Sequence, residues 1–189
     1  DSEAARARLE QFAQEAEALP LVLRIELDHD GELHFTPRGA PGPVKGPVRV
    51  RLSGAQVDPG DRFLYHKTSR RDLYNQERED ATRDGFFEVL FTNIEGRLTE
   101  GSITNVFLLI DEGWVTPPIS EGLLPGLWRA AFLRKSEGRE APLPLSELGK
   151  ATHVYIGNSV RGRIPVGEIV DTEGKVIWRG GVSQATASG

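Results

Sequence analysis

Two residues of this chain, a lysine and a carboxylate, have the chemistry needed to hold and activate an amine. Lys67 lies in the aromatic and basic stretch FLYHKTSRR at positions 63–71, and Glu100 follows it 33 positions later. Lysine amines form Schiff bases when burial or nearby cations lower their pKa, and Arg70 and Arg71 are close enough in sequence to act as such cations. A carboxylate can keep the nitrogen of a pyridine ring protonated, which makes the ring an electron sink. Together the two residues indicate a pyridoxal phosphate site.

A predicted helix start offers one place for the phosphate of such a cofactor. The sequence GLLPGLWR at positions 122–129 is predicted to enter a helix that runs to about Lys135, with Pro125 near the first turn, where proline is favoured. Unpaired N–H groups and the positive end of the helix dipole attract anions at such a start. The helix entry at Leu127 and Trp128 is therefore a candidate phosphate site.

A second candidate for anion binding lies near the carboxyl end of the chain. A strand is predicted to end at Gly157, and Asn158 and Ser159 then offer an amide and a hydroxyl side by side. Hydroxyl groups bind phosphate oxygens well. The basic residues Arg161 and Arg163 follow directly and add positive charge to this segment.

Each of these segments also has an ordinary interpretation that involves no chemistry. A single lysine is most often a solvated surface residue, and a single glutamate is more often a turn carboxylate than a cofactor ligand. Leu-Pro-Gly before a helix and Asn-Ser after a strand are common turn sequences. Arg161 and Arg163 are equally consistent with an exposed charge pair, and His66 with packing beside Lys67.

The elements that must position these residues alternate between helix and strand patterns. Before Lys67, the spacing of apolar residues predicts a helix over 4–19, a hairpin of strands at 21–27 and 32–36, a loop over 37–47 and a strand over 48–52. After Lys67, it predicts a polar helix over 68–82, strands at 86–91 and 105–110 bounded by turns at 93–96 and 111–113, and later strands at 154–156, 164–170 and 175–178. The tail 180–189 is predicted to be disordered.

Composition restricts the class of protein. The chain has 189 residues, 38% of them hydrophobic, which is enough to bury a core in one domain or two small ones. Its net charge of -5 and the absence of a dense basic run argue against binding of nucleic acid. Because there is no cysteine, thiol catalysis, disulfides and thiolate metal sites are excluded. The histidines, at 29, 34, 66 and 153, are too dispersed to predict a metal site.

The sequence also indicates the surroundings in which the protein acts. No stretch approaches the roughly 18 apolar residues of a membrane span, and the first residues look like an acidic, alanine-rich helix rather than a signal peptide. We therefore expect a cytoplasmic protein without a membrane segment. The chain starts at Asp1 and contains no methionine, so we expect it to be part of a longer polypeptide.

Four blocks of the sequence, taken in order, resemble one enzyme family. They are YHKTSRR at 65–71, LTEGSITN at 98–105, GLLPGLWR at 122–129 and GNSVRGRIPV at 157–166. The set is similar to the fold-type IV pyridoxal phosphate enzymes, which include branched-chain and D-amino acid aminotransferases and 4-amino-4-deoxychorismate lyase. The chain looks most like the lyase branch, especially the form fused to aminodeoxychorismate synthase component I in bacterial folate synthesis. The resemblance covers residues from about 20 to 170.

The resemblance implies a role for each block. Lys67 would be the Schiff-base lysine and proton shuttle, and Glu100 would be the partner of the pyridine nitrogen. Arg161 would face a carboxylate of a small-molecule substrate. The phosphate would be bound by residues of two segments, namely by the backbone amides of Leu127 and Trp128 with help from Asn158 and Ser159.

The resemblance also implies an architecture and an assembly. The fold would be α/β with mixed strands, a barrel-like core and flanking helices. Residues 61–180 would form the large domain that binds pyridoxal phosphate, residues 1–60 would be a remnant of, or link from, a small amino-terminal domain, and residues 181–189 would be a tail. Members of the family are usually homodimers, and a chorismate-utilising synthase domain could be fused upstream.

The lyase would convert 4-amino-4-deoxychorismate to 4-aminobenzoate and pyruvate. An aminotransferase would share the first steps and then reprotonate the cofactor, and a non-catalytic domain that keeps the fold is a third alternative. Two features depart from the family pattern. The tyrosine that many aminotransferases carry five residues after the lysine is replaced by Asp72, and the nearest tyrosine is Tyr74. Only a helix and a hairpin precede the lysine region, whereas the small amino-terminal domain of the family contributes an arginine to the phosphate and part of the substrate pocket, so we expect the active site in this chain to be incomplete.

Overall fold

The structure, a computed structural model, describes residues 2–15 and 20–180 and forms two compact units, Asp1–Pro43 and Val44–Gly189. The end of the predicted first helix at 16–19 and the predicted tail at 181–189 lie outside the described residues. The boundary between the two compact units lies between Pro43 and Val44. The reason is that strand β3 (Val48–Val57) pairs on both sides with strands of the second unit.

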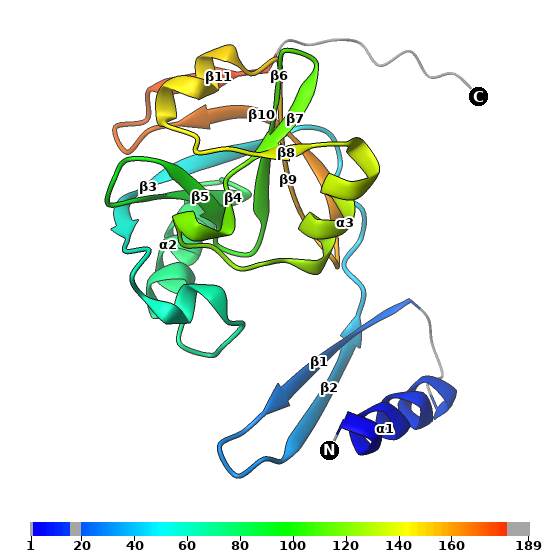
Figure 1. Cartoon of the computed structure of the whole chain (residues 1–189). Coiled ribbons are helices and arrows are strands. Elements are labelled where there is room, and N and C mark those ends of the chain that lie inside the picture. The colour runs from blue at the N-terminus through cyan, green and yellow to red at the C-terminus, as the bar shows by residue number, and fades with distance from the viewer. Residues whose placement is uncertain (1, 16–19, 181–189) are drawn as a thin grey trace, which may run out of the picture. The chain divides into compact units, whose positions relative to one another are not determined.

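The first unit contains helix α1 (Ser2–Glu15) and a hairpin of strands β1 (Leu21–Leu27) and β2 (Leu33–Gly39) (Figure 1). The two strands pair antiparallel from Leu21 opposite Gly39 to Leu27 opposite Leu33, so the predicted hairpin is confirmed. The predicted loop from residue 37 is wrong at its start, because Pro37 still pairs with Leu23. Both strands of a two-stranded ribbon are edges, where a residue without an N–H group is tolerated.

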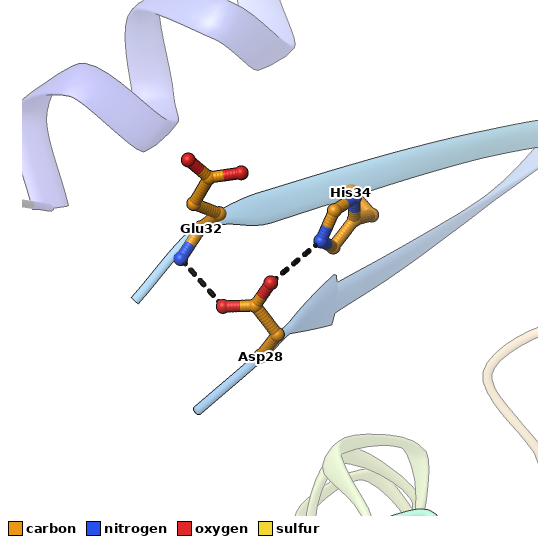
Figure 2. Close-up of side chains that lie close together, drawn as sticks. All are labelled: Asp28, Glu32 and His34. Carbon is orange, nitrogen blue, oxygen red and sulfur yellow. Dashed lines mark hydrogen bonds and ion pairs between the residues drawn. The ribbon is translucent and has the colours of Figure 1, made fainter. Parts of the chain in front are cut away.

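The tip of this hairpin is organised by the carboxylate of Asp28. Its Oδ1 accepts hydrogen bonds from the backbone N–H groups of Asp30 and Glu32, at 3.0 and 2.9 Å, and its Oδ2 lies 2.9 Å from Nε2 of His34 (Figure 2). Strand pairing thus brings potential metal-ligand atoms of Asp28, Glu32 and His34 within 4.8 Å of one another, a group that the dispersed histidines did not predict. The hydrogen bonds account for this group as a device that closes the turn.

The second unit contains the remaining elements. Its helices are α2 (Asp72–Arg83), α3 (Leu127–Ser136) and the 3-10 turns η1 (Arg62–Tyr65), η2 (Ile119–Glu121) and η3 (Leu145–Lys150). Besides β3, its strands are β4 (Glu88–Asn93), β5 (Leu98–Gly101), β6 (Asn105–Ile110), β7 (Gly113–Thr116), β8 (Arg139–Glu140), β9 (His153–Asn158), β10 (Gly162–Val170) and β11 (Val176–Arg179). Among the helices of the described residues, none is long and apolar enough to cross a membrane.

Six strands of the second unit close into a ring. Going round it, β10 pairs with β3, β3 with β4, β4 with β5, β5 with β6, β6 with β9, and β9 with β10 again. The two pairs that involve β3 are parallel and the others are antiparallel. The predicted α/β architecture with mixed strands and a barrel-like core is therefore confirmed (Figure 1).

Alternation along the strands separates the interior of the barrel from the faces that the helices cover. The larger core cluster includes Val50, Leu90 and Val106. Val89, which precedes Leu90, and Phe107, which follows Val106, lie on outer faces. Helix α2 covers β4 and helix α3 covers β9. Strands covered on both faces can bury consecutive residues, which explains the apolar runs at 89–91 of β4 and 106–110 of β6.

Helix α2 is the crossover that joins the parallel strands β3 and β4, and Lys67 lies on the way into it. The helix begins at Asp72 rather than at Thr68, because the Thr68 hydroxyl accepts a hydrogen bond from the backbone N–H of Arg70 in a local turn. It ends at Arg83, and Gly85, with a φ of 82°, lets the chain reverse just after it, where the N–H groups of Gly85 and Phe86 donate back to the last turn.

The other predicted strands of the second unit are all present, with ends that differ by a few residues. Three short strands, β5, β7 and β8, were not predicted. They have four, four and two residues, too few for a pattern of period two to stand out. One of them, β5, carries Glu100.

We predict that Asp28→Asn lowers the pKa of His34. In the native hairpin the hydrogen bond to Asp28 raises the pKa of His34 above its ordinary value of 6.5, and the same contact lowers the pKa of Asp28. The contribution of this contact to stability is thus complete between about pH 4 and about pH 6.5, is lost as the pH rises through the folded pKa of His34, and is also lost as the pH falls through the folded pKa of Asp28. An NMR titration of the imidazole protons measures the shift.

The matched control is Asp30→Asn, which removes a charge from the same turn but not the contact with His34. It should leave the His34 titration where it is in the parent protein. Equal shifts in the two variants would show that the net charge of the turn, and not the Asp28 contact, sets the pKa.

Candidate active site

Glu100 is a buried carboxyl group at the end of β5. It is 8% exposed, and Oε2 accepts a hydrogen bond of 3.3 Å from Nδ2 of Asn105, the residue opposite it on β6. Burial raises the pKa of Glu100 to about 8, against the opposing effects of the Leu124 backbone N–H and the Arg71 guanidinium. At pH 7 the group therefore carries a proton, although a cation placed against it would favour the charged form.

The segment that follows Lys67 folds against Glu100. Arg71, the N-cap of α2, donates a hydrogen bond to the backbone carbonyl of Ser102, two residues beyond Glu100, and its guanidinium carbon lies 5.6 Å from the centre of the Tyr74 ring. Tyr74 stacks against Phe91 at 4.5 Å between ring centres. Both Arg71 and Tyr74 favour the charged form of Glu100 and so oppose the rise of its pKa that burial causes. These contacts join the lysine segment to the carboxylate.

Lys67 itself lies between η1 and α2 with an exposed side chain. The turn before it is fixed by Asp61, whose side chain accepts a hydrogen bond of 2.9 Å from the backbone N–H of Phe63. Of the two cations expected to act on Lys67, Arg70 stacks on the Phe63 ring at 4.4 Å, and Arg71 turns toward Glu100. Arg70 therefore contacts the residues before Lys67, whereas Arg71 acts on Glu100.

The predicted helix start at Leu127 is present. Helix α3 begins at Leu127 with Gly126 as its N-cap, and no side chain caps its first turn. Pro125 lies just before the helix and not in its first turn. Asn105 links this start to Glu100, because its Nδ2 also donates to the Leu124 carbonyl at 3.2 Å and its Oδ1 occupies the place where a Cβ on residue 126 would lie. Only glycine fits there.

The side chains of Leu127 and Trp128 do not cover their own backbone amides, which lie at the start of α3. Leu127 points to solvent, with 83% of its surface exposed. The Trp128 ring packs against Phe107 and Phe132, at 5.5 and 5.3 Å between ring centres, and fills the space beside Gly157 that a Cβ would need. The start of α3 and the end of β9 are therefore in direct contact.

The turn after β9 places the remaining predicted residues. The Asn158 side chain donates to the Ile103 carbonyl at 3.0 Å and accepts from the backbone N–H groups of Val160 and Arg161, at 3.0 and 2.9 Å. Ser159 is exposed. The Arg161 guanidinium lies 5.6 Å from the centre of the Phe87 ring. The Asn158 amide is thus engaged in holding the turn, and the exposed hydroxyl of Ser159 is the group that could reach an anion.

All these segments meet at one short loop, residues 101–104, which we call the hub loop. It follows Glu100 and precedes Asn105, and its carbonyl groups accept the hydrogen bonds from Arg71 and Asn158. Gly101 closes the loop through its N–H to the Thr104 carbonyl at 2.7 Å, and a Cβ there would overlap the Thr104 hydroxyl.

The hub loop is held by a residue that the sequence analysis did not identify, Glu88. This carboxylate is fully buried at the start of β4. Its oxygens accept hydrogen bonds from donors of the loop and of neighbouring elements, namely the N–H groups of Val89, Ser102 and Ile103, the hydroxyls of Ser102 and Thr104, and the Arg78 guanidinium. A charged residue in an otherwise apolar run was the available signal, since buried charges occur only with partners.

We predict that Glu88→Gln destabilises the protein by about 2 to 4 kcal/mol, because the new amide would place its own N–H groups against loop donors that need an acceptor. The free energy of unfolding from urea denaturation measures the effect. The control is Glu79→Gln, an exposed position on α2, which we expect to change stability by less than about 0.5 kcal/mol. Similar losses in the two variants would mean that the Glu88 hydrogen bonds do not hold the loop.

Comparison with known proteins gives consistent results. The family model described as Amino-transferase class IV matches residues 3–169. Among curated proteins, the chain is 27% identical over 139 residues to the "Probable branched-chain-amino-acid aminotransferase" of Thermotoga maritima, covering 70% of this chain and 50% of that protein. It is 31% identical over 120 residues to the aminodeoxychorismate lyase of Saccharomyces cerevisiae, covering 54% of this chain and 32% of that protein.

Among solved structures, the fold is similar to the crystal structure of a "Putative amino-acid aminotransferase" from Mesorhizobium loti. The TM-score is 0.79 at 32% sequence identity, over 87% of this chain and 80% of that one. The chain therefore spans most of this solved structure, but about half or less of the two curated relatives. Because members of the matched family use pyridoxal phosphate, the cofactor expected from the sequence is that of the family. The chain belongs to the class IV aminotransferase family.

Proposed function

We propose that this chain is part of a pyridoxal phosphate-dependent lyase that converts 4-amino-4-deoxychorismate to 4-aminobenzoate and pyruvate. The observation that carries the proposal is the buried Glu100, which is joined by hydrogen bonds and packing to the segment after Lys67 and to the start of α3. The choice of the lyase is supported by the similarity to the yeast aminodeoxychorismate lyase and by the basic HKTSRR block.

Three features of the described residues fit a phosphorylated pyridine cofactor. Glu100 is a buried carboxyl group whose charged form needs a cation, such as a protonated ring nitrogen. The buried Tyr74 hydroxyl has no hydrogen-bond partner of ordinary geometry within the described part of the chain. Gly126 leaves the first amides of α3 without a covering side chain.

The proposed roles follow from these positions. When bound, pyridoxal phosphate withdraws electrons from the carbon that bears the substrate nitrogen. Lys67 would hold the cofactor covalently until the substrate amine replaces it, and Glu100 would hold the ring nitrogen. Arg161 would bind a substrate carboxylate. The phosphate would be held by groups of two segments, the backbone amides of Leu127 and Trp128 and the neighbouring Asn158 and Ser159.

Lys67 would also carry the proton in the lyase reaction. Its free amine would take the proton from the substrate carbon that bears nitrogen. The bond from the neighbouring ring carbon to the enolpyruvyl oxygen then breaks, the ring becomes aromatic, and the enolpyruvyl group takes up a proton to leave as pyruvate. No oxidant or reductant is needed, because the two products together contain all atoms of the substrate.

The second candidate function is amino acid transamination. It is favoured by the Thermotoga maritima relative, which aligns with a larger share of this chain than the yeast lyase does. In that case Lys67 would return the proton to the cofactor and no bond to the enolpyruvyl oxygen would break. A non-catalytic role of the domain is a third possibility, and an inability to bind cofactor would support it.

The proposal includes the setting of the enzyme. We infer a homodimer that acts in the cytoplasm in folate synthesis, with a chorismate-utilising synthase domain fused upstream. The small amino-terminal domain would be represented by α1 and the hairpin of β1 and β2. These inferences rest on the resemblance to the lyase branch.

We predict that pyridoxal phosphate forms a borohydride-reducible adduct on Lys67. A visible absorption band should appear when the chain is mixed with the cofactor, and mass spectrometry after reduction should locate the added mass on the peptide with Lys67. Lys67→Ala should lose both signals. The control is Lys45→Ala, which removes another exposed lysine and should retain them. Labelling that is equal in parent and Lys67→Ala would contradict the assignment.

The products separate the two enzymatic candidates. With 4-amino-4-deoxychorismate alone, the lyase should release 4-aminobenzoate and pyruvate in equal amounts, and Lys67→Ala should lose this release at least about 100-fold. An aminotransferase should instead transfer nitrogen from a branched-chain amino acid to a keto acid. Transfer without release of 4-aminobenzoate would overturn the lyase proposal in favour of the second candidate.

A further inference from the structure

We propose that Tyr74 is a positioning residue for Glu100, because its buried hydroxyl donates a hydrogen bond to the ionised Glu100 carboxylate and holds it toward the ring nitrogen of the bound cofactor. The inference rests on the proposed function and deepens it. The family pattern leaves this tyrosine without a role, because the position that many aminotransferases use is Asp72 here.

The position of the Tyr74 ring is determined by packing. It lies on the first turn of α2 and stacks on Phe91 at 4.5 Å between ring centres, with an interplanar angle of 36°. The guanidinium carbon of Arg71 also lies over the Tyr74 ring, 5.6 Å from the ring centre. Leu64 and Phe86 belong to the same small cluster on the outer face of β4. A ring held in this way directs its hydroxyl along a fixed line.

The Tyr74 hydroxyl is an anomaly in its present state. It is buried, yet no group in the described part of the structure forms a hydrogen bond of ordinary geometry with it. A buried polar group without a partner costs free energy and calls for an explanation. Glu100, the carboxyl group that acts most strongly on the Tyr74 hydroxyl, carries a proton at neutral pH and so is a poorer acceptor than a carboxylate. The hydroxyl therefore gains a strong acceptor only when Glu100 ionises.

The charged groups around this pair agree with that account. Burial raises the pKa of Tyr74 above its ordinary value, and the Glu100 charge raises it further, so the hydroxyl keeps its proton and can donate. From α2, Arg71 favours the charged form of Glu100, and from β4, Glu88 opposes it. Asp61, the N-cap of η1, adds to the rise for Tyr74. Tyr74, in the first turn of α2, and Arg71, the N-cap of α2, thus both favour an ionised Glu100.

Asp72 does not take over this role. It is the first residue of α2 and is exposed, with its charge at the positive end of the helix dipole. Tyr65, the tyrosine before the lysine, donates its hydroxyl to the Pro59 carbonyl at 2.7 Å. Tyr74 is the tyrosine whose hydroxyl is available to Glu100.

The test is Tyr74→Phe, which keeps the stacked ring and removes only the hydroxyl. The infrared carbonyl band of protonated Glu100, identified by its absence in Glu100→Gln, reports ionisation without any cofactor. We expect its midpoint to move to higher pH by about one unit in Tyr74→Phe, because the charged form has lost a hydrogen bond. The pH at which pyridoxal phosphate binds most tightly should move in the same direction.

The matched control is Tyr155→Phe, which removes the hydroxyl of a β9 residue whose ring packs against Trp114 of β7. Tyr155→Phe should leave the midpoints of the carbonyl band and of cofactor binding at their parent values. If Tyr74 served packing alone, Tyr74→Phe would leave both midpoints unchanged as well. The ultraviolet spectrum of the parent protein gives a measurement that needs no Tyr74 variant. A tyrosine signal should change with the same midpoint as the carbonyl band and should be lost in Glu100→Gln.

The outcomes separate the two proposals. Unchanged midpoints in Tyr74→Phe, or a tyrosine signal that does not follow Glu100, would overturn the role of Tyr74. A carbonyl shift in a chain that binds no pyridoxal phosphate would uphold the contact between Tyr74 and Glu100 and reject the proposed function.

Discussion

The site depends on one fully buried carboxylate, Glu88. By the alternation of β4 it shares the face of Leu90, so it points into the end of the barrel, where a charge without partners would be strongly unfavourable. Six donors satisfy it, and four of them come from the hub loop. These hydrogen bonds fix the loop, because each of its donors must point toward a Glu88 oxygen. Glu100 and Asn105, at the two ends of the loop, are thereby fixed as well.

Closure of the barrel makes this arrangement possible. The pairing of β6 with β9 brings Asn105 opposite Gly157, two residues 52 positions apart in the chain. That contact places the turn after β9 beside the start of α3, where the Trp128 ring lies against Gly157. Three loops and one helix start then share a single end of the barrel. A mobile loop at this end would lose several hydrogen bonds at once, so we expect the end to behave as a rigid unit.

Much of this could be predicted from the sequence, and the rest has a common physical cause. Lys67 and Glu100 could be singled out by residue type, and the start of α3 by its turn sequence, because these signals are local. Glu88 could not be assigned, since its meaning depends on a loop that follows 13 positions later and folds back over it. The same holds for the contact of the Asn158 side chain with the Ile103 carbonyl, because the two residues lie 55 positions apart in the chain. The strand β5 was missed because its four residues are buried by neighbours and not by their own pattern.

The raised pKa of Glu100 connects the rigidity of the loop with the chemistry. Because the buried carboxyl group of Glu100 is neutral in the free chain, it places no unpaired charge in the barrel end, which is stable without a ligand. Under the proposed function, Glu100 would hold the ring nitrogen of the cofactor and supply the negative charge that favours its protonated form. That role requires the carboxylate to stay in place, because the Coulomb energy in a poorly solvated site falls steeply with distance. The fixed hub loop keeps it there, and Arg71 and Tyr74 favour the charged state once it forms. Glu88 therefore fixes the position of the Glu100 carboxyl group through the hub loop, whereas burial raises its pKa and Arg71 and Tyr74 favour its charged form.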